Sequence, residues 1–169
     1  MRSAPDSVGF QPARTHGIAR KIAPDTYKVK RKLPEPTLCP GCGAVYRNGC
    51  WQWEEIGVAN EALCPACNRQ HDNFPAGLVA VSGDFIAAHE AEIFGVVLAQ
   101  EEREKVEHPL RRVMDIERSS GTLLVTTTDA QFAHNIGETL HQIFHGELKL
   151  NYNREMNMLL VQWQRQTGE

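Results

Sequence analysis

Four of the five cysteines occur as two closely spaced pairs. Cys39 and Cys42 form a CPGCG motif, Cys64 and Cys67 form a CPAC motif, and 21 residues separate the pairs. This is the spacing of a zinc ribbon, and Gly43 follows the first pair where a tight turn favours positive φ. Four thiolates make a closed tetrahedral Zn²⁺ site with no position for a substrate. We therefore predict one structural zinc ion bound by Cys39, Cys42, Cys64 and Cys67.

Two other roles for these cysteines fit the sequence less well. A disulfide framework needs an even number of cysteines and an oxidising compartment, whereas this chain has five, and its first 30 residues lack the apolar centre of a secretory signal. A pair of thioredoxin-like redox motifs would need a βαβ context, which the sequence does not show. No stretch of about 18 apolar residues occurs either. We therefore predict a cytoplasmic protein with reduced cysteines and no membrane association.

Cys50 is the cysteine left over by the two pairs. It precedes Trp51 and Trp53 in GCWQWEE, an alternating pattern that is typical of a strand. Cysteine commonly behaves as a small, buried apolar residue. We therefore predict that Cys50 packs in the interior and does not bind the metal ion.

The charge of the chain is divided unevenly. Residues 1–36 carry eight Lys and Arg against three acidic residues, a net charge of +5, whereas residues 37–169 carry ten against eighteen, a net charge of −8. The first segment is rich in proline and poor in large apolar residues, so it is not expected to fold by itself. A flexible cationic segment gains affinity for RNA by releasing counterions, although a solvated tail without a specific role would have the same composition.

Because this basic tail leads directly into the cysteine motifs, we favour RNA as its partner. Tyr27 could stack on a base, and Arg47 and Arg69 lie close to the cysteine motifs, although solvation explains these two arginines equally well. Arg111 and Arg112 are adjacent, so one is expected to meet RNA and the other to pair with a carboxylate of the preceding helix. The predicted RNA contacts are Tyr27, Lys28, Lys30, Arg31, Lys32, Arg47, Arg69, Arg111 and Arg112.

The last hundred residues predict a two-helix α+β domain. Apolar periodicity and Pro109 indicate the first helix, while Thr128 and Gln131 match a capping box at the start of the second, which Gly146 ends. Strand-like runs flank a turn at residues 119–121, and two more follow the second helix. Local hairpins favour a mainly antiparallel, four-stranded sheet with both helices on one face. The predicted order is helix, strand, strand, helix, strand and strand, at residues 82–109, 110–118, 122–128, 128–146, 147–152 and 158–165.

The second predicted helix carries a stripe of His134, Glu138, His141 and His145. Only His141 and His145 have the i, i+4 spacing with which two imidazoles share a metal ion, and no HExxH motif supplies a catalytic base. We interpret the stripe as a polar face that contacts water or a partner.

Several motifs together resemble those of a family of short bacterial zinc-ribbon proteins with no assigned activity. The resemblance covers most of residues 25–165, in CPGCGAVY, CPAC, FPAG, SGDF, EREKVEHPL and VTTTDAQFAHNIGETLHQIFHGEL. More distantly, the order of these motifs is similar to the amino-terminal part of the archaeal and eukaryotic adaptor for nuclear export of the large ribosomal subunit. That likeness implies contact with the large subunit and the same four cysteines as zinc ligands. The chain lacks the adaptor's further zinc-binding pairs and later domains, and Cys50 replaces an arginine expected in the bacterial relatives.

These observations predict a basic flexible tail at residues 1–36, a zinc ribbon at 37–77 and an α+β domain at 78–169. The predicted function is a non-enzymatic, ribosome-associated factor that contacts ribosomal RNA on the large subunit, in assembly, quality control or hibernation. Ribosomal proteins are further expected partners, and no small-molecule substrate is expected. The alternative is a zinc-stabilised protein-interaction or transcription-linked module with the acidic body as its working surface. An enzyme is least favoured, because no motif combines a nucleophile, a base and an orienting group.

Overall fold

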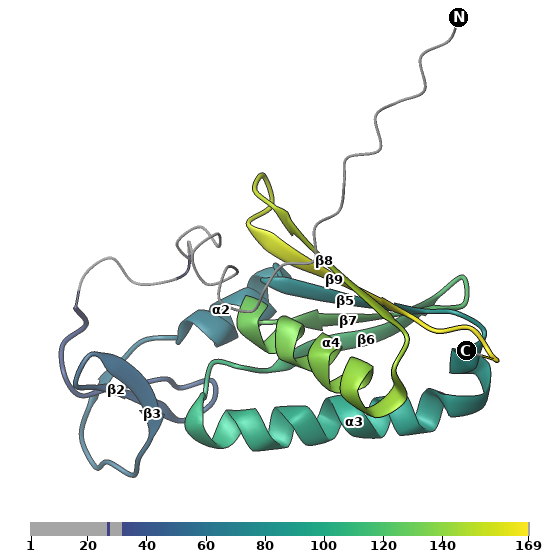
Figure 1. Ribbon diagram of the computed structural model, residues 1–169. Helices are drawn as coiled ribbons and strands as arrows, with labels where there is room; N and C mark the ends of the chain where they lie inside the picture. The colour runs from purple at the N-terminus through teal and green to yellow at the C-terminus, as the bar shows by residue number, and fades with distance from the viewer. Residues whose placement is uncertain (1–26, 28–31, 169) are drawn as a thin grey trace, which may run out of the picture.

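The computed structural model describes Tyr27 and residues 32–168 of the chain. These residues form two β-sheets and the helices α2, α3 and α4 (Figure 1). A small sheet with the cysteine motifs lies at one end of the molecule, and a larger sheet carries the two long helices. The mixed α+β class predicted from the sequence is confirmed.

The four-stranded sheet next to the cysteine motifs consists of very short strands. Its order is β3-β2-β1-β4, with β1 paired antiparallel to β2 and parallel to β4. Asn48 and Gly49 have φ values of 54° and 79°, which suit a two-residue turn between β2 and β3. The bounds are Thr37–Leu38 for β1, Ala44–Arg47 for β2, Cys50–Trp53 for β3, Asn60–Glu61 for β4 and Pro65–Asp72 for α2. We call this part, residues 37–74, the metal module.

The five-stranded sheet has the order β6-β7-β5-β9-β8. Neighbouring strands are antiparallel, apart from β5 and β9, which are parallel. The bounds are Gly77–Ser82 for β5, Val113–Ser119 for β6, Thr122–Thr127 for β7, Glu147–Asn153 for β8 and Met158–Gln164 for β9.

The predicted layout of four strands and two helices is wrong in two places. Strand β5 lies at the centre of the sheet, where Val79 pairs with Val125 on one side and Val161 on the other. Most residues of β5 were assigned to no element, because the partners of β5 are too distant in the chain for a local hairpin pattern to reveal them. Helix α2 was also not predicted, since it has only eight residues and most of them are polar.

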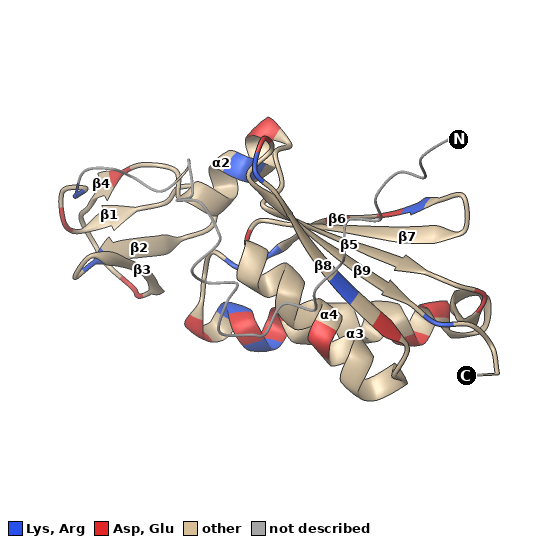
Figure 2. Ribbon diagram, turned by 45° about the horizontal axis from the view of Figure 1, so that its top comes forward, with Lys and Arg blue, Asp and Glu red and all other residues tan. Residues whose placement is uncertain are grey.

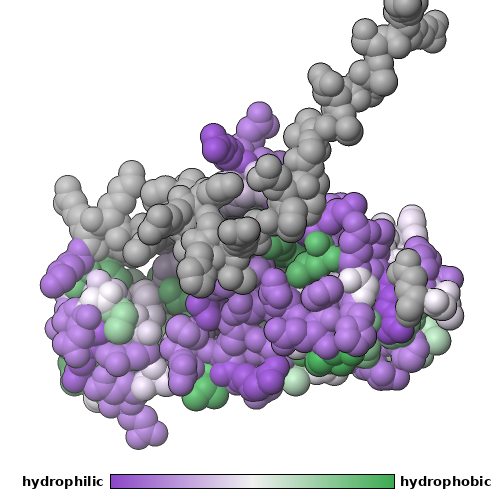
Figure 3. All heavy atoms as spheres, in the orientation of Figure 1, coloured by the Kyte–Doolittle hydropathy of each residue, from purple (hydrophilic) through white to green (hydrophobic). Residues whose placement is uncertain are grey.

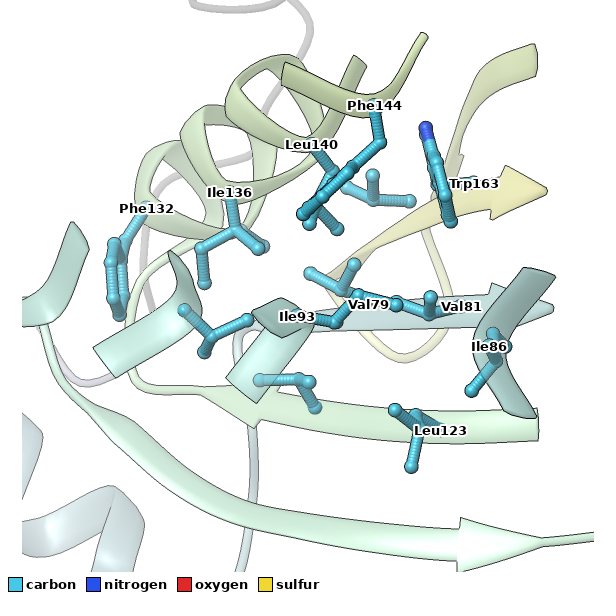
Figure 4. Close-up of a cluster of buried hydrophobic side chains, with 14 of the residues drawn as sticks. Val79, Val81, Ile86, Ile93, Leu123, Phe132, Ile136, Leu140, Phe144 and Trp163 are labelled. Atoms are coloured by element: carbon cyan, nitrogen blue, oxygen red, sulfur yellow. The ribbon is translucent and has the colours of Figure 1, made fainter. Parts of the chain in front are cut away.

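Both long helices pack on one face of the five-stranded sheet (Figure 1). Helix α3 spans Phe85–Glu107, and helix α4 spans Ala130–Phe144. In α4, Phe132, Ile136 and Leu140 follow at intervals of one turn and are fully buried. Figure 4 shows these side chains pointing towards Val79 and Val81 of the sheet and Ile93 of α3. The larger sheet therefore has an apolar core of its own.

The start of α4 is tied to the segment before β6. Asp129, rather than the predicted Thr128, caps α4, because its Oδ1 accepts a hydrogen bond of 2.7 Å from the Phe132 N–H. The Thr128 hydroxyl instead donates to the Leu110 carbonyl at 2.6 Å and accepts from the Arg112 N–H at 2.9 Å. These two hydrogen bonds hold the backbone of Arg112, from which its side chain extends.

The surface seen in Figure 3 is largely hydrophilic, with separate apolar patches. Among the described residues, no helix combines the length and the hydropathy that crossing a membrane requires. The longest helix, α3, ends in EEREKVE, a run of charged side chains with a single apolar residue.

Two glycines with positive φ allow a matched test of packing in the larger domain. The φ values of Gly83 and Gly121 are 106° and 78°, so alanine is strained at both positions. A Cβ at Gly83 would also overlap the backbone oxygen of Arg165, whereas a Cβ at Gly121 meets no described atom within 4 Å. We expect Gly83→Ala to lower the free energy of unfolding by about 3 kcal/mol more than Gly121→Ala, measured by urea denaturation. Equal losses would contradict the close approach of residues 83 and 165.

Candidate metal centre

The four cysteines of the two motifs come together in the metal module. Their sulfur atoms all lie within 4.8 Å of one another. The Sγ atoms of Cys39 and Cys67 are 3.7 Å apart, and those of Cys42 and Cys64 are 3.8 Å apart. Cys39 and Cys64 are buried, and the other two are partly buried. The predicted ligand set therefore forms a single cluster that is compatible with one metal ion.

Each cysteine pair is held at a tight turn. The Gly43 N–H donates to the Cys39 carbonyl at 2.9 Å, and the φ of Gly43 is 83°, a value that glycine adopts without strain. Cys64 is the N-cap of α2, and its sulfur accepts from the Cys67 N–H at 3.4 Å. Pro65 follows at the first helical position, where no N–H is needed.

The sulfur separations fit a tetrahedral metal ion. Zinc–sulfur bonds of about 2.3 Å place the corners of a regular tetrahedron about 3.8 Å apart. The Cys39–Cys67 and Cys42–Cys64 separations of 3.7 and 3.8 Å agree with that value, and the other separations do not exceed 4.8 Å. Within the part of the chain that the structure describes, no imidazole or carboxylate joins the cluster. A set of thiolates alone suits zinc or iron and not magnesium or calcium, and four of them leave no ligand position for a substrate.

A single arginine of the larger domain reaches two of the sulfurs. Arg112 Nη1 donates to Cys67 Sγ and Nη2 donates to Cys64 Sγ, both at 3.3 Å. The Arg112 side chain is buried, with 7% of the residue exposed. Four thiolates around a divalent ion carry a net charge of −2, so this buried guanidinium neutralises part of the excess charge.

The Arg112 guanidinium is held in place by groups other than sulfur. Its Nε donates to the Pro109 carbonyl at 3.0 Å, and Nη1 lies 3.4 Å from the Gln70 side-chain oxygen. The backbone carbonyl of Arg112 accepts from the Thr128 N–H at 3.0 Å, in addition to the bond from its own N–H to the Thr128 hydroxyl. Arg112 therefore connects the metal module with the start of α4.

The thiols of Cys42 and Cys64 share a hydrogen bond. The pKa of Cys42 is lowered to about 4, mainly because its sulfur accepts this bond. Burial raises this pKa, whereas the Ala44 N–H and the charge of Arg112 lower it further. The pKa of Cys64 is raised, because its thiol donates that bond and is buried. The pKa of Cys67 is raised as well, chiefly by burial, so metal binding has to displace protons from both of these thiols.

Cys50 lies outside the cluster and is exposed. The prediction that it packs in the interior is wrong, because β3 is an edge strand of a small sheet and the alternation of its residues does not bury this position. The neighbouring Trp53 contacts the larger domain, since its indole N–H donates to the Lys105 carbonyl of α3 at 2.7 Å.

Two of the predicted RNA contacts pack against each other. Arg69 is only 1% exposed, and its Nη1 donates to the Phe74 carbonyl at 3.0 Å. Its guanidinium lies 4.4 Å from the centroid of the Tyr27 ring, and the Tyr27 hydroxyl donates to Asp72 at 2.9 Å. The expectation that Arg69 faces RNA is corrected by its burial, and one face of the Tyr27 ring is covered by this arginine.

The remaining predicted RNA contacts differ in their exposure and in their partners. Arg47 pairs with Glu54 at 3.0 Å and keeps 40% of its side chain exposed. Arg111 pairs with Glu104 of α3 at 2.9 Å, the carboxylate pairing expected for one of the two adjacent arginines. The other, Arg112, is buried against sulfur, which corrects the expectation that it meets RNA. Lys32 is exposed, and Lys28, Lys30 and Arg31 lie outside the described residues.

The predicted polar stripe of α4 is divided by the fold. His134 is buried, with its Nε2 3.3 Å from the Glu138 carboxylate, so the expectation that it lies on a face that contacts water or a partner is wrong. His141 is exposed, and its Nδ1 lies 3.0 Å from the Gly146 carbonyl. His145, also exposed, forms the end of α4. Across Tyr27 and residues 32–168, the four cysteines are the only group of three or more potential metal ligands that converge.

Comparison with known proteins identifies no relative of this chain. No protein-family model matches it, and neither a curated protein nor a solved structure is significantly similar to it. The resemblance to short bacterial zinc-ribbon proteins and to the export adaptor therefore stays a prediction.

Proposed function

We propose that this protein binds one Zn²⁺ at the four cysteines and acts as a non-enzymatic factor that binds RNA, specifically ribosomal RNA of the large subunit. Assembly, quality control and hibernation all agree with this proposal. The observation that supports it most directly is the docking of Tyr27 on α2, because Tyr27 immediately precedes the cationic cluster of the tail.

Zinc is preferred over iron because the site is a small structural one. Structural zinc sites commonly use four cysteines in two such motifs, and the ion stabilises modules that have little apolar core. Here the buried cluster of the module consists of four small residues, Cys39, Ala44, Cys64 and Ala66. Elemental analysis of the purified, reduced chain should find one zinc per chain and a colourless protein. Iron with visible absorption would contradict the choice of zinc.

The docking of Tyr27 holds both ends of the cationic cluster near the metal module. Tyr27 contacts Arg69 and Asp72 of α2, and Lys32 leads through Glu35, which accepts from the Gly49 N–H at 2.9 Å, into β1. A cationic segment with tethered ends loses less conformational entropy when it binds a polyanion than a free tail loses.

Two charge-matched triple variants test this role of the cluster. Lys28, Lys30 and Arg31 are replaced by alanine in one variant, and Arg14, Arg20 and Lys21 in the other, so each loses three positive charges. We expect the first variant to leave 50S and 70S fractions in sucrose gradients at moderate salt. The slope of log affinity against log salt for single-stranded ribosomal RNA should also fall by about 2. The second variant should have a smaller effect on both measurements.

Equal losses in the two variants would show that the tail acts through its net charge, without a specific contribution from the anchored cluster. Sedimentation of the unmodified protein only at the top of the gradient, with no binding to RNA, would refute the proposed function.

A second candidate, a protein-interaction module, is favoured by the charges of the folded body. Residues 37–169 carry a net charge of −8, and Arg69, Arg111 and Arg112 are engaged by internal partners. Figure 2 shows acidic and basic residues alternating along the part of α3 next to the metal module. Association that withstands nuclease and high salt would support this candidate over RNA binding.

A further inference from the structure

A cleft of about 550 Å³ separates the metal module from the larger domain. Tyr46 of β2 and Trp51 of β3 line it from the metal module. Glu107, at the end of α3, and His108 line it from the larger domain, together with Arg111 and Asp129. The volume lies within the range of small-ligand sites, and such sites are frequent where two structural units meet.

Aromatic rings form the wall of this cleft on the side of the metal module. Tyr46 and Trp51 face each other across β2 and β3, with ring centroids 5.5 Å apart and planes tilted by 59°. Both residues are partly exposed. Two tilted aromatic rings beside an open space offer π-electron density from two directions, an arrangement that attracts cations.

The charged groups on the opposite side of the cleft also favour a positively charged ligand. Two carboxylates, Glu107 and Asp129, line the cleft, whereas Arg111 is its only Lys or Arg. The Arg111 charge is already compensated, since its guanidinium lies 2.9 Å from Glu104 and 3.5 Å from Asp129. With histidine counted as neutral, the lining carries a net charge of −1, which repels a phosphate and attracts a cation.

We propose that this cleft binds an organic cation, the guanidinium or ammonium group of a basic side chain from a partner protein. The aromatic pair contacts the cationic head, and the Glu107 carboxylate supplies a counter-charge at the opposite wall. The volume of the cleft also admits the main chain that adjoins the side chain. This proposal rests on residues that take no part in the proposed RNA contact, so the two can fail separately.

Nuclear magnetic resonance of the full-length, metal-loaded protein tests the proposal with defined probes. Nα-acetyl-arginine amide, Nα-acetyl-lysine amide and the peptide Gly-Gly-Arg-Gly-Gly represent the free and peptide-borne cation, and adenosine monophosphate represents a planar anion. We expect the cations to shift the Trp51 indole signal and the amides of Gly49 and His108 in a saturable manner. The peptide should bind more tightly than the amino-acid amides if the natural source is a protein, and no more tightly if it is a free amine. Adenosine monophosphate should leave these signals unchanged.

Two variants and one matched control identify the groups responsible. Glu107→Gln should weaken binding of the arginine amide about fivefold at low salt, and Trp51→Leu about tenfold. Glu102→Gln removes a charge from another exposed glutamate of α3 that does not line the cleft, and it should change the affinity less than twofold, roughly the effect of a distant surface charge. Because Trp51 also packs beside the cysteines, its variant is interpreted only after its metal content is confirmed, and Glu107→Gln provides the independent test.

Three results would overturn the proposal. These are binding of the nucleotide in place of the cations, unchanged affinity of Glu107→Gln for the arginine amide, and the absence of any saturable shift with all probes. Loss of RNA binding in the tail variants has no bearing on these outcomes.

Discussion

Removal of the metal ion should unfold the metal module and leave the five-stranded domain intact. The two parts have separate apolar clusters, and the cluster of the module contains only four small buried residues, two of them cysteines of the candidate metal site. Structural zinc contributes on the order of 10 kcal/mol in modules of this kind, which a core of that size cannot replace. Hydrogen exchange measured by mass spectrometry after chelation should show lost protection at residues 37–74 and retained protection at residues 77–164.

Two cysteine-to-serine substitutions test the same dependence on the metal ion without a chelator. Cys64→Ser removes a ligand that also caps α2, so it should abolish stoichiometric metal binding and reproduce the exchange pattern of the chelated protein. Cys50→Ser changes an exposed sulfur outside the cluster, so the metal content should stay at one ion per chain. Retained protection of residues 37–74 in Cys64→Ser would mean that the module folds without its metal ion.

Replacing Arg112 should weaken the metal site although Arg112 is not a ligand. Arg112→Met removes the donors that now reach Cys64 and Cys67 at 3.3 Å and leaves the excess charge of the thiolates buried without compensation. Changes to groups that bond to metal ligands typically cost 10- to 100-fold in metal affinity, and we expect roughly that loss here. Competition with a chromophoric chelator measures the affinity directly.

Arg111→Met is the matched control, because it removes the adjacent arginine with the same change of charge and size. Arg111 bonds to Glu104 and Asp129, so its loss should lower stability while changing the metal affinity by no more than about threefold. Arg112→Lys should fall between Arg112→Met and the unmodified protein, since an ammonium keeps the charge but cannot hold the fixed fork that reaches both sulfurs. Equal metal affinities in the Arg111 and Arg112 variants would show that the two guanidinium–sulfur contacts are not significant.

Short-range patterns predicted the parts of this fold whose geometry depends on neighbouring residues. The two CxxC motifs close at local turns, so the spacing of Cys39, Cys42, Cys64 and Cys67 was sufficient to predict their convergence. Helix α4 was also predictable, because its apolar residues recur with the helical period, and Pro109 indicated the end of α3. Their placement on one face of a mainly antiparallel sheet followed from the short connections between the strands.

The central strand and the burial of single residues depended on distant partners. In β5, Gly77 pairs with Thr127 and Leu159, and no hairpin signal connects segments so far apart in the chain. Cys50 and His134 show the same limit for side chains, because a local pattern indicates which residues share a face but not which face is covered.

The amino-acid sequence by itself determined the four candidate metal ligands, the α+β class and the separation of charge between tail and body, since each depends on residue type and short spacing. Only the tertiary structure decided which partners the arginines contact, because a guanidinium on a long side chain bonds to whichever acceptors the fold brings within reach. Arg69 is enclosed beneath Tyr27, Arg111 pairs with α3, and Arg112 crosses to the sulfur atoms of a motif 45 residues away.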